Sequence, residues 1–312
     1  MTQKKNIKKL KRFLETERMH AEIYSYLAKE EDHLKHKRFL NKIKDEEKEH
    51  EKLIAEILKD EGAKVSSGGA FRIRFLFYKI VSKIFGVPFG IAAIERDEDS
   101  TIKDYIKLLK EVRSEKHNSK IKKIIKDEEE GEEELQKNLS DYSEHFDYIK
   151  SIVFGLNDGL VEILAVVSGL AVVATSPLVV VIGGIIVGLS GTLSMAGGAY
   201  LSSKSYNLVE EEKNGRSTDT SPAKDAVYTG IFYFLGSLAS VLPFAFGLSG
   251  FAGILGAIII VSIVLVLASA VIGVVSRTSI KRRSIEMLTI SLGAAFVTIV
   301  LGIILKSYGI AI

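Results

Sequence analysis

Five long apolar segments fill the second half of the chain, and they constrain its fold more strongly than any other feature. The segments cover residues 151–174, 178–201, 226–247, 250–275 and 286–308. Each reaches the roughly 20 apolar residues that a helix needs to cross a bilayer. The alternative, a buried helical core in a soluble protein, is disfavoured because five such segments in series are hard to bury. The sequence therefore predicts a five-helix transmembrane domain.

The first half of the chain has the opposite composition. Residues 1–150 are rich in Lys and Glu, a division hidden by the whole-chain averages of 47% hydrophobic and 26% charged residues. We expect an all-α protein with a soluble helical domain over residues 1–145 and the membrane domain over residues 146–312. The absence of cysteine excludes disulfides and thiolate metal ligands. The net charge is only +3 and the charges are interspersed, which does not favour nucleic-acid binding.

Positive charges fall on alternate connections between the apolar segments. The connections at residues 175–177 and 248–250 carry no charge. By the positive-inside rule the two basic connections are cytoplasmic, and the N-terminal domain is then cytoplasmic as well. No cleavable signal peptide is predicted, so we expect a prokaryotic plasma membrane, with an organelle membrane as the alternative. The basic residues are Lys204, Lys213, Arg216 and Lys224 in the second connection, and Arg277, Lys281, Arg282 and Arg283 in the fourth.

Two carboxylates interrupt the first apolar segment. Asp158 and Glu162 are four residues apart and therefore lie on one face of a helix. A carboxylate in hydrocarbon costs at least ~2.5 kcal/mol, so such residues typically mark an ion or proton path. The alternative is that Asp158 caps a helix that starts at the membrane surface. In the second segment, Met195 is either a filler of helix packing or a soft ligand for a metal on this path.

The N-terminal half contains a Glu-x-x-His pair within an internal repeat. Glu47 and His50 are three residues apart, so both can reach one metal from the same helix. Two helical hairpins that share one register would place four carboxylates in a four-helix bundle, and Glu95 would add a fifth. Carboxylates with imidazole suit Fe2+ or Mn2+, and bound cations relieve the repulsion between the carboxylates. Spacings of 7, 23 and 3 separate Glu17, Tyr24, Glu47 and His50, and likewise Glu98, Tyr105, Glu128 and Gly131.

On these residues the N-terminal half resembles the rubrerythrin-like (erythrin) branch of the ferritin-like superfamily. The resemblance implies a ferritin-like bundle with a di-metal site. The family usually has a second His where this chain has Gly131, so we expect the second metal to be held more weakly, to be ligated by water, or to be completed by Glu132 or Glu95. Without cysteine the chain also lacks the rubredoxin-type iron of full rubrerythrins, which argues against a self-contained peroxidase. The implied ligands are Glu17, Glu47, His50, Glu95, Glu98 and Glu128.

An amphipathic segment, residues 70–90, separates the two hairpins. It either lies on an anionic membrane surface or packs against its own bundle, and Pro88 is expected to end its helix. Arg72, Lys79 and Lys83 cluster on one side of its helical wheel, and Ile73, Phe77, Ile80 and Ile84 form another stripe.

The membrane half resembles the vacuolar iron transporter family over nearly its whole length, through FGLNDGLVEILAVVSGL (154–170) and SMAGGAYLSSKS (194–205). The resemblance implies a homodimer that passes divalent metal between its subunits, with Asp158 and Met195 on the path. Some members have a Glu where Ala199 stands here, and Glu162 could compensate. Eukaryotic members also carry a Glu-rich helical insertion between spans two and three. Because this connection is short here, we expect the N-terminal bundle to collect the metal.

Three functions remain open. The first is a transporter that exports Fe2+ or Mn2+ from the cytoplasm by proton antiport. The second is a membrane-anchored diiron oxidase or peroxide-scavenging enzyme, and the third is a tethered iron store or sensor. Five spans with Asp158 inside favour transport, because an anchor needs only one span. Gly131 disfavours the oxidase.

Overall fold

The computed structural model describes residues 2–65, 71–112, 114–214 and 221–312. These residues form helices joined by short connections, and no strand occurs among them. The chain divides into two compact units, Met1–Ser143 and Glu144–Ile312, called here the bundle unit and the membrane unit. The sequence predicts this boundary after residue 145.

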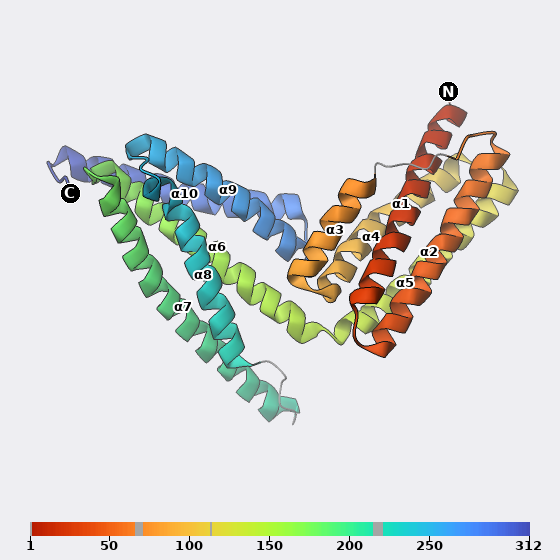
Figure 1. Ribbon diagram of the computed structural model, residues 1–312, viewed down its shortest axis with the longest axis horizontal. Helices are drawn as coiled ribbons and strands as arrows, with labels where there is room; N and C mark the ends of the chain where they lie inside the picture. Colours follow the sequence, from red (N-terminus) through yellow and green to blue (C-terminus); the bar gives the residue numbers. More distant parts are fainter. Residues whose placement is uncertain (1, 66–70, 113, 215–220) are drawn as a thin grey trace. The chain divides into compact units, whose positions relative to one another are not determined.

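The bundle unit contains five helices (Figure 1), α1 (Thr2–Glu30), α2 (Leu34–Asp60), α3 (Phe71–Phe85), α4 (Val87–Glu111) and α5 (Glu115–Ser140). Helices α1, α2, α5 and α4 pack in a ring, each against the next, and therefore form a four-helix bundle. Apolar residues at helical spacing on each of them build a core that includes Leu14, Ile54, Leu108 and Ile121. The side chain of Ser114 accepts a hydrogen bond from the His117 amide and so caps the start of α5.

Helix α3 follows residues 66–70, which lie outside the described part of the chain, and packs against α1 and α4. It ends at Phe85 because Gly86 adopts a left-handed φ of 84° and Pro88 then starts α4, as the sequence predicted. Tyr78 and Ser82 face the bundle and are buried. The predicted apolar stripe through Ile73 and Ile84 is exposed instead, so this stripe does not pack against the bundle.

The membrane unit contains five helices, each long and apolar enough to cross a membrane. The candidate spans are His145–Val173, Pro177–Lys213, Pro222–Ala245, Gly250–Val275 and Ile280–Ser307. They lie within α6 (Ser143–Val173), α7 (Pro177–Asn214), α8 (Pro222–Ala245), α9 (Gly250–Val275) and α10 (Ile280–Ser307). The prediction of an all-α chain with five spanning helices is confirmed for the described residues, and the chain fits an integral membrane protein.

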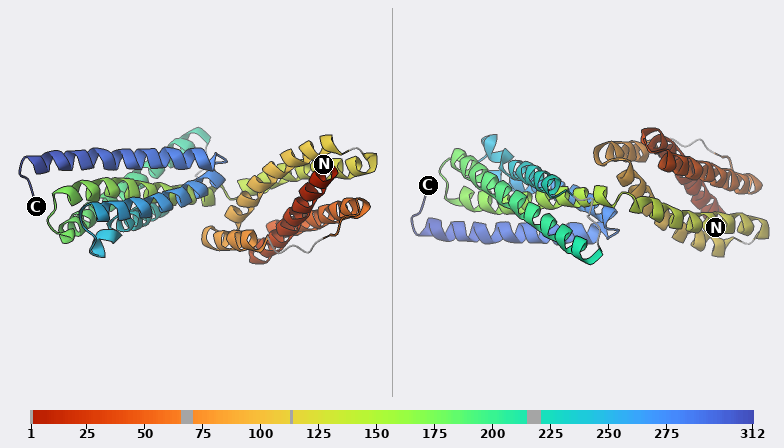
Figure 2. Two further views of the ribbon diagram at one scale, coloured as in Figure 1. Left: turned by 90° about the horizontal axis from the view of Figure 1, so that it is seen from above. Right: turned by 90° about the horizontal axis from the view of Figure 1, so that it is seen from below.

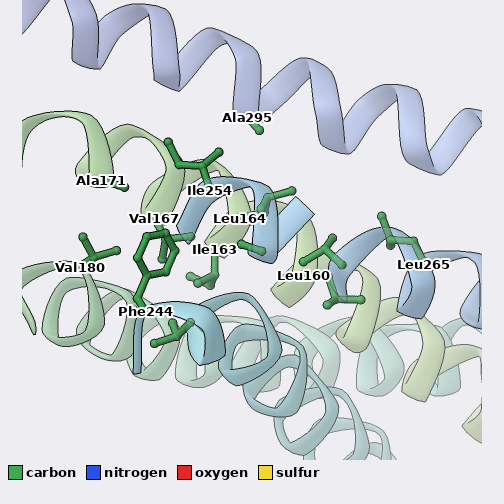
Figure 3. Close-up of a cluster of buried hydrophobic side chains, with 13 residues drawn as sticks. Leu160, Ile163, Leu164, Val167, Ala171, Val180, Phe244, Ile254, Leu265 and Ala295 are labelled. Carbon is green, nitrogen blue, oxygen red and sulfur yellow. The ribbon is translucent and has the colours of Figure 1, made fainter. Parts of the chain in front are cut away.

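Helix α6 supplies the largest share of the core of the membrane unit (Figure 3). Leu160, Ile163, Leu164 and Val167 of this helix are buried among side chains from α7, α8, α9 and α10. Glycines allow close approach at two of its contacts. A Cβ at Gly159 would lie 2.2 Å from the carbonyl oxygen of Tyr233 on α8, and one at Gly302 on α10 would lie 2.8 Å from that of Gly169. Figure 2 shows α10 running alongside α6.

Two helices extend further than the sequence indicated. Helix α6 is continuous from Ser143, so Asp158 lies far inside the helix and does not cap its start; that alternative is wrong. Helix α7 continues to Asn214 and includes the three consecutive glutamates 210–212 of the predicted connection. At 1.5 Å per residue, a helix of 38 residues is about 57 Å long and exceeds the ~30 Å hydrocarbon layer, so part of α7 lies outside it.

Candidate metal sites

Two adjacent groups of metal-ligand side chains lie inside the bundle unit. Within each group, one ligand atom from every residue lies within 4.8 Å of the others. All these side chains are buried or nearly so, and Glu47 belongs to both groups, so its carboxylate can bridge two metal ions. The first group is Glu17, Glu47, His50 and Glu128, and the second is His20, Glu47 and Glu98.

Helical spacing explains why these residues converge. Glu17 and His20 are three residues apart on α1, as Glu47 and His50 are on α2, so each pair lies on one inward face. Helices α4 and α5 supply one glutamate each, Glu98 and Glu128. The first hairpin therefore contributes both imidazoles, and the second hairpin contributes carboxylates only.

Two tyrosines connect the hairpins in a reciprocal arrangement. The hydroxyl of Tyr24 on α1 donates a hydrogen bond of 2.9 Å to Glu98 on α4. The hydroxyl of Tyr105 on α4 donates to Glu17 on α1. These four residues are the repeat partners that the spacing of 7 identified, so the two hairpins are related by an approximate twofold rotation. Both hydrogen bonds fix the orientation of a carboxylate that faces the cluster.

An aspartate lies behind each imidazole. His20 Nε2 lies 3.4 Å from Asp97 Oδ2, while its Nδ1 lies 3.6 Å from Glu98 Oε1. His50 Nε2 lies 3.5 Å from Asp127 Oδ2, while its Nδ1 lies 3.2 Å from Glu128 Oε1. In metal sites a carboxylate on the outer ring nitrogen fixes the tautomer and the orientation of a ligating histidine. Both histidines therefore have the surroundings of metal ligands.

Several buried polar atoms of the cluster have no hydrogen-bond partner, namely Glu17 Oε2, Glu47 Oε2 and both ring nitrogens of His50. A buried polar atom without a partner costs about 1–3 kcal/mol, and such atoms are rare in folded proteins. A divalent cation between Glu17 Oε2, Glu47 Oε2 and His50 Nδ1 would satisfy these three atoms together, while His50 Nε2 faces Asp127. The residues present thus fit a site for two metal ions with oxygen and imidazole ligands.

The pKa values of these groups reflect the number of carboxylates that are buried together in the cluster. Burial, followed by repulsion from Glu17 and Glu128, raises the pKa of Glu47 well above its usual value. Burial and the charge of Glu128 raise the pKa of Glu98 to about 8. Burial alone would lower the pKa of His20, but its interactions with Asp97 and Glu98 raise it to about 9. Protons therefore compensate the negative charge where no cation does so.

The structure brings most, but not all, of the predicted ligands together. Glu17, Glu47, His50, Glu98 and Glu128 come together, whereas Glu95 is buried on α4 but belongs to neither group. His20 was missed, although Glu17-x-x-His20 repeats the spacing of Glu47-x-x-His50. It supplies an imidazole on the side of the cluster opposite His50.

Gly131 opens the bundle beside the cluster. A Cβ at this position would meet nothing within 4 Å, and Gly131 lines a cavity of about 20 Å³ that Glu47, His50, Glu98 and Glu128 also line. This volume is enough for about one water molecule. The half-buried carboxylates of Glu46, Asp127 and Glu132 line the same cavity. The cluster thus has an acidic opening where a second His would otherwise stand.

In the membrane unit, Asp158 and Glu162 lie on α6 well inside the span. Asp158 is half-buried, and Glu162 is exposed in the single chain. The hydroxyl of Tyr233 on α8 donates a hydrogen bond of 2.6 Å to Glu162 Oε2. Gly191 on α7 makes room for this hydroxyl, since a Cβ there would lie 2.1 Å from it. Tyr233 was not predicted from the sequence.

Met195 lines an open pocket of about 780 Å³ between α6, α7 and α8. Asp147 on α6 and Asp225 on α8 line the same pocket, and the Ser151 hydroxyl donates a hydrogen bond of 3.0 Å to Asp225. Asp158 and Glu162 do not line it. Met195 and Asp158 therefore do not share this pocket.

Comparison with known protein families gives a match in the membrane unit. Residues 149–218 and 206–303 match the VIT family, and together they cover the helices that carry Asp158, Glu162 and Met195. The comparison with curated proteins finds no significant match. The family match indicates membrane transport of metal ions such as iron or manganese. A VIT family domain is therefore present over residues 149–303.

Proposed function

We propose that this protein exports Fe2+ or Mn2+ from the cytoplasm in exchange for protons, and that a ferritin-like bundle unit captures the metal. The observation that carries the proposal is a VIT family domain with two carboxylates inside its first span. A carboxylate that must be charged to hold M2+ and neutral when empty is suited to exchange a metal ion for protons.

The surroundings of Glu162 support a path between two subunits. A charged group facing lipid inside the span costs at least ~2.5 kcal/mol, so the exposed Glu162 needs water or protein around it. A homodimer that pairs α6 and α7 across a twofold axis provides both. It would bring two copies of Asp158, Glu162 and Met195 to one path.

The bundle supports capture. Its ligand atoms are buried and partly without partners, and the opening at Gly131 gives an acidic approach to them. Glu17, Glu47, His50 and Glu128 would hold one ion, and His20, Glu47 and Glu98 the other. Such an approach favours loading and release of cargo over permanent retention.

The basic residues at the helix ends support the orientation. Lys204 and Lys213 lie near the end of α7, Lys224 lies at the start of α8, and Lys281 and Arg282 lie at the start of α10. These ends belong to the same side of a five-helix unit that begins with α6 on that side. By the positive-inside rule this side is cytoplasmic, and so is the bundle.

The test is metal flux into vesicles that contain the full chain, with Fe2+ or Mn2+ followed by an internal chelating dye and the internal pH recorded. We expect saturable flux with counter-moving protons. Asp158→Asn should reduce the flux to that of empty vesicles, while Glu286→Gln, a change at an exposed carboxylate of α10, should not. Equal flux in the wild type and Asp158→Asn would contradict the transport path.

A second candidate activity, oxidation of Fe2+ in the bundle, is favoured by the second imidazole that His20 supplies. Its signature would be oxygen consumption that depends on Fe2+. Wild-type protein that shows this consumption without flux would favour the enzyme over the transporter.

A further inference from the structure

Helix α3 carries an apolar face that the described residues of the bundle unit leave exposed. Ile73 is 81% exposed, Phe77 57% and Ile84 67%, although the helix packs firmly on its other side through Tyr78 and Ser82. Leu76 and Ile80 complete the face at 55% and 49%. Their spacings of three and four residues place all five on one side of a helix of four turns.

Basic residues border this apolar face. Arg72, Lys79 and Lys83 recur at helical spacing along one edge, and all three are exposed. On the other edge Arg74 pairs with Asp97, the aspartate behind His20. The charged edge therefore presents cations beside hydrophobic side chains, the pattern of a helix that lies in the plane of an anionic lipid surface.

The bundle end that carries the last turn of α3 is also the end from which the chain continues toward the first span. A Cβ at Gly90, just after α3, would lie 2.9 Å from Leu27 Cδ2, one turn before the end of α1. At the same end, the Tyr142 hydroxyl donates to Glu31, directly after α1, and α6 begins one residue beyond Tyr142 (Figure 1). The last turn of α3 thus lies at the end of the bundle unit from which the chain enters its first candidate span.

We propose that α3 docks on the anionic lipid surface of the membrane that the chain spans, with Ile73, Phe77 and Ile84 in the acyl boundary and Arg72 and Lys83 among the headgroups. A second copy of the chain fits the apolar face of α3 less well than lipid does. A twofold contact through this face would bring two rows of Arg72, Lys79 and Lys83 close together without opposing charges, whereas anionic lipid attracts them.

The chain has no cysteine, so a single engineered cysteine gives a unique label. Full-length Phe77→Cys, with Ile73→Cys as a second position, would carry a nitroxide in phosphatidylcholine vesicles with and without phosphatidylglycerol. Lys48→Cys, at an exposed position of α2, is the matched control. Relaxation by oxygen, which concentrates in lipid, is compared with relaxation by a water-soluble nickel complex.

We expect the label at residue 77 to be reached by oxygen more than by nickel when phosphatidylglycerol is present, and the label at residue 48 to show the reverse. Because each basic residue near an anionic surface contributes about fivefold, Arg72→Glu with Lys83→Glu should lower the ratio of docked to undocked α3 by at least about 30-fold. A label at residue 77 that is as accessible to nickel as the control would overturn the proposal. So would protection from both reagents together with short distances between labels on two chains, which would assign the face to a second copy.

Discussion

The carboxylates of the bundle unit and those of the membrane unit lie in different surroundings. In the bundle, Glu17 and Glu47 are enclosed by their own chain, and four helices supply their partners. In the membrane unit, Glu162 accepts a hydrogen bond from Tyr233 and is exposed in the single chain. The first arrangement is enclosed within one chain, whereas the second leaves a carboxylate of a candidate span exposed.

The two units also differ in how their helices approach each other. Bundle helices meet through large side chains such as Phe13 and Tyr105, whose rings stack 4.2 Å apart, and through ion pairs at the rim. Membrane helices meet at glycines, as Gly159 on α6 does against the backbone of α8. Small residues serve in lipid because packing, rather than exclusion of water, drives association there.

The largest effect is expected at the shared ligand of the bundle. Glu47→Gln removes the carboxylate that both ligand groups include, so the affinity for both ions should fall by more than about 100-fold, beyond the loss typical of outer-sphere changes. Metal content per chain after equilibration with Mn2+ measures this. Glu49→Gln, an exposed change on the same helix, should keep wild-type content. Unchanged binding in Glu47→Gln would remove the bundle from the metal pathway.

A smaller effect is expected at His20. His20→Gln should weaken one of the two ions by about 10- to 100-fold and leave the other in place, because only the second group loses a ligand. Gly131→His in the same chain should restore part of the loss, since open space surrounds that position. Two-step Mn2+ titration followed by electron paramagnetic resonance separates the ions. Equal weakening of both steps would contradict separate roles for the two imidazoles.

In the membrane unit we expect a stability effect of a few kcal/mol or less. Gly159→Ala forces α6 and α8 apart, and overpacking of this kind costs about 1–3 kcal/mol, more than the ~1 kcal/mol that Ala gains over Gly in a helix. The midpoint of thermal unfolding in detergent should therefore fall. Gly293→Ala on α10, where a Cβ meets nothing within 4 Å, lacks the clash and should leave the midpoint unchanged or raise it.

The smallest effect is expected at an ion pair between α1 and α4. Lys9 Nζ lies 2.8 Å from Glu111 Oε2, and both side chains are about one-third exposed. Lys9→Met should change the free energy of unfolding of the bundle by less than about 1 kcal/mol, because solvent screens such pairs. Denaturant unfolding followed by circular dichroism measures it. A larger loss of unfolding free energy would mean that ion pairs at the bundle surface, and not the apolar core, hold the hairpins together.

The sequence allowed prediction of features that depend on local periodicity. Five apolar segments predicted five candidate spans, and the repeat of Glu17, Tyr24 and Glu47 in Glu98, Tyr105 and Glu128 identified residues that the structure brings together. The repeat could do so because equal spacing on paired helices produces equivalent positions in a bundle. The VIT family match agrees with the residues that carried the resemblance in the membrane half.

Features that depend on packing between distant segments were not predictable in the same way. His20 has Thr101 as its repeat partner, so comparison of the two hairpins drew no attention to it. Glu95 has the correct residue type and spacing one turn from Glu98, yet it belongs to neither ligand group. Tyr233 meets Glu162 only because Gly191 leaves room for its hydroxyl, a relation between three helices that no single pattern contains.

The presence of both imidazoles on the first hairpin has a consequence for tracing the ancestry of such domains. Either copy of a duplicated hairpin can lose or gain a ligand as long as the shared interior keeps its set. In an alignment, a column with Gly131 in place of a histidine reads as a lost metal ligand. The interior of this bundle nevertheless contains two imidazoles. A search for metal sites in such proteins should therefore count all histidines that face the interior of the bundle, and should not judge the site from a single aligned position.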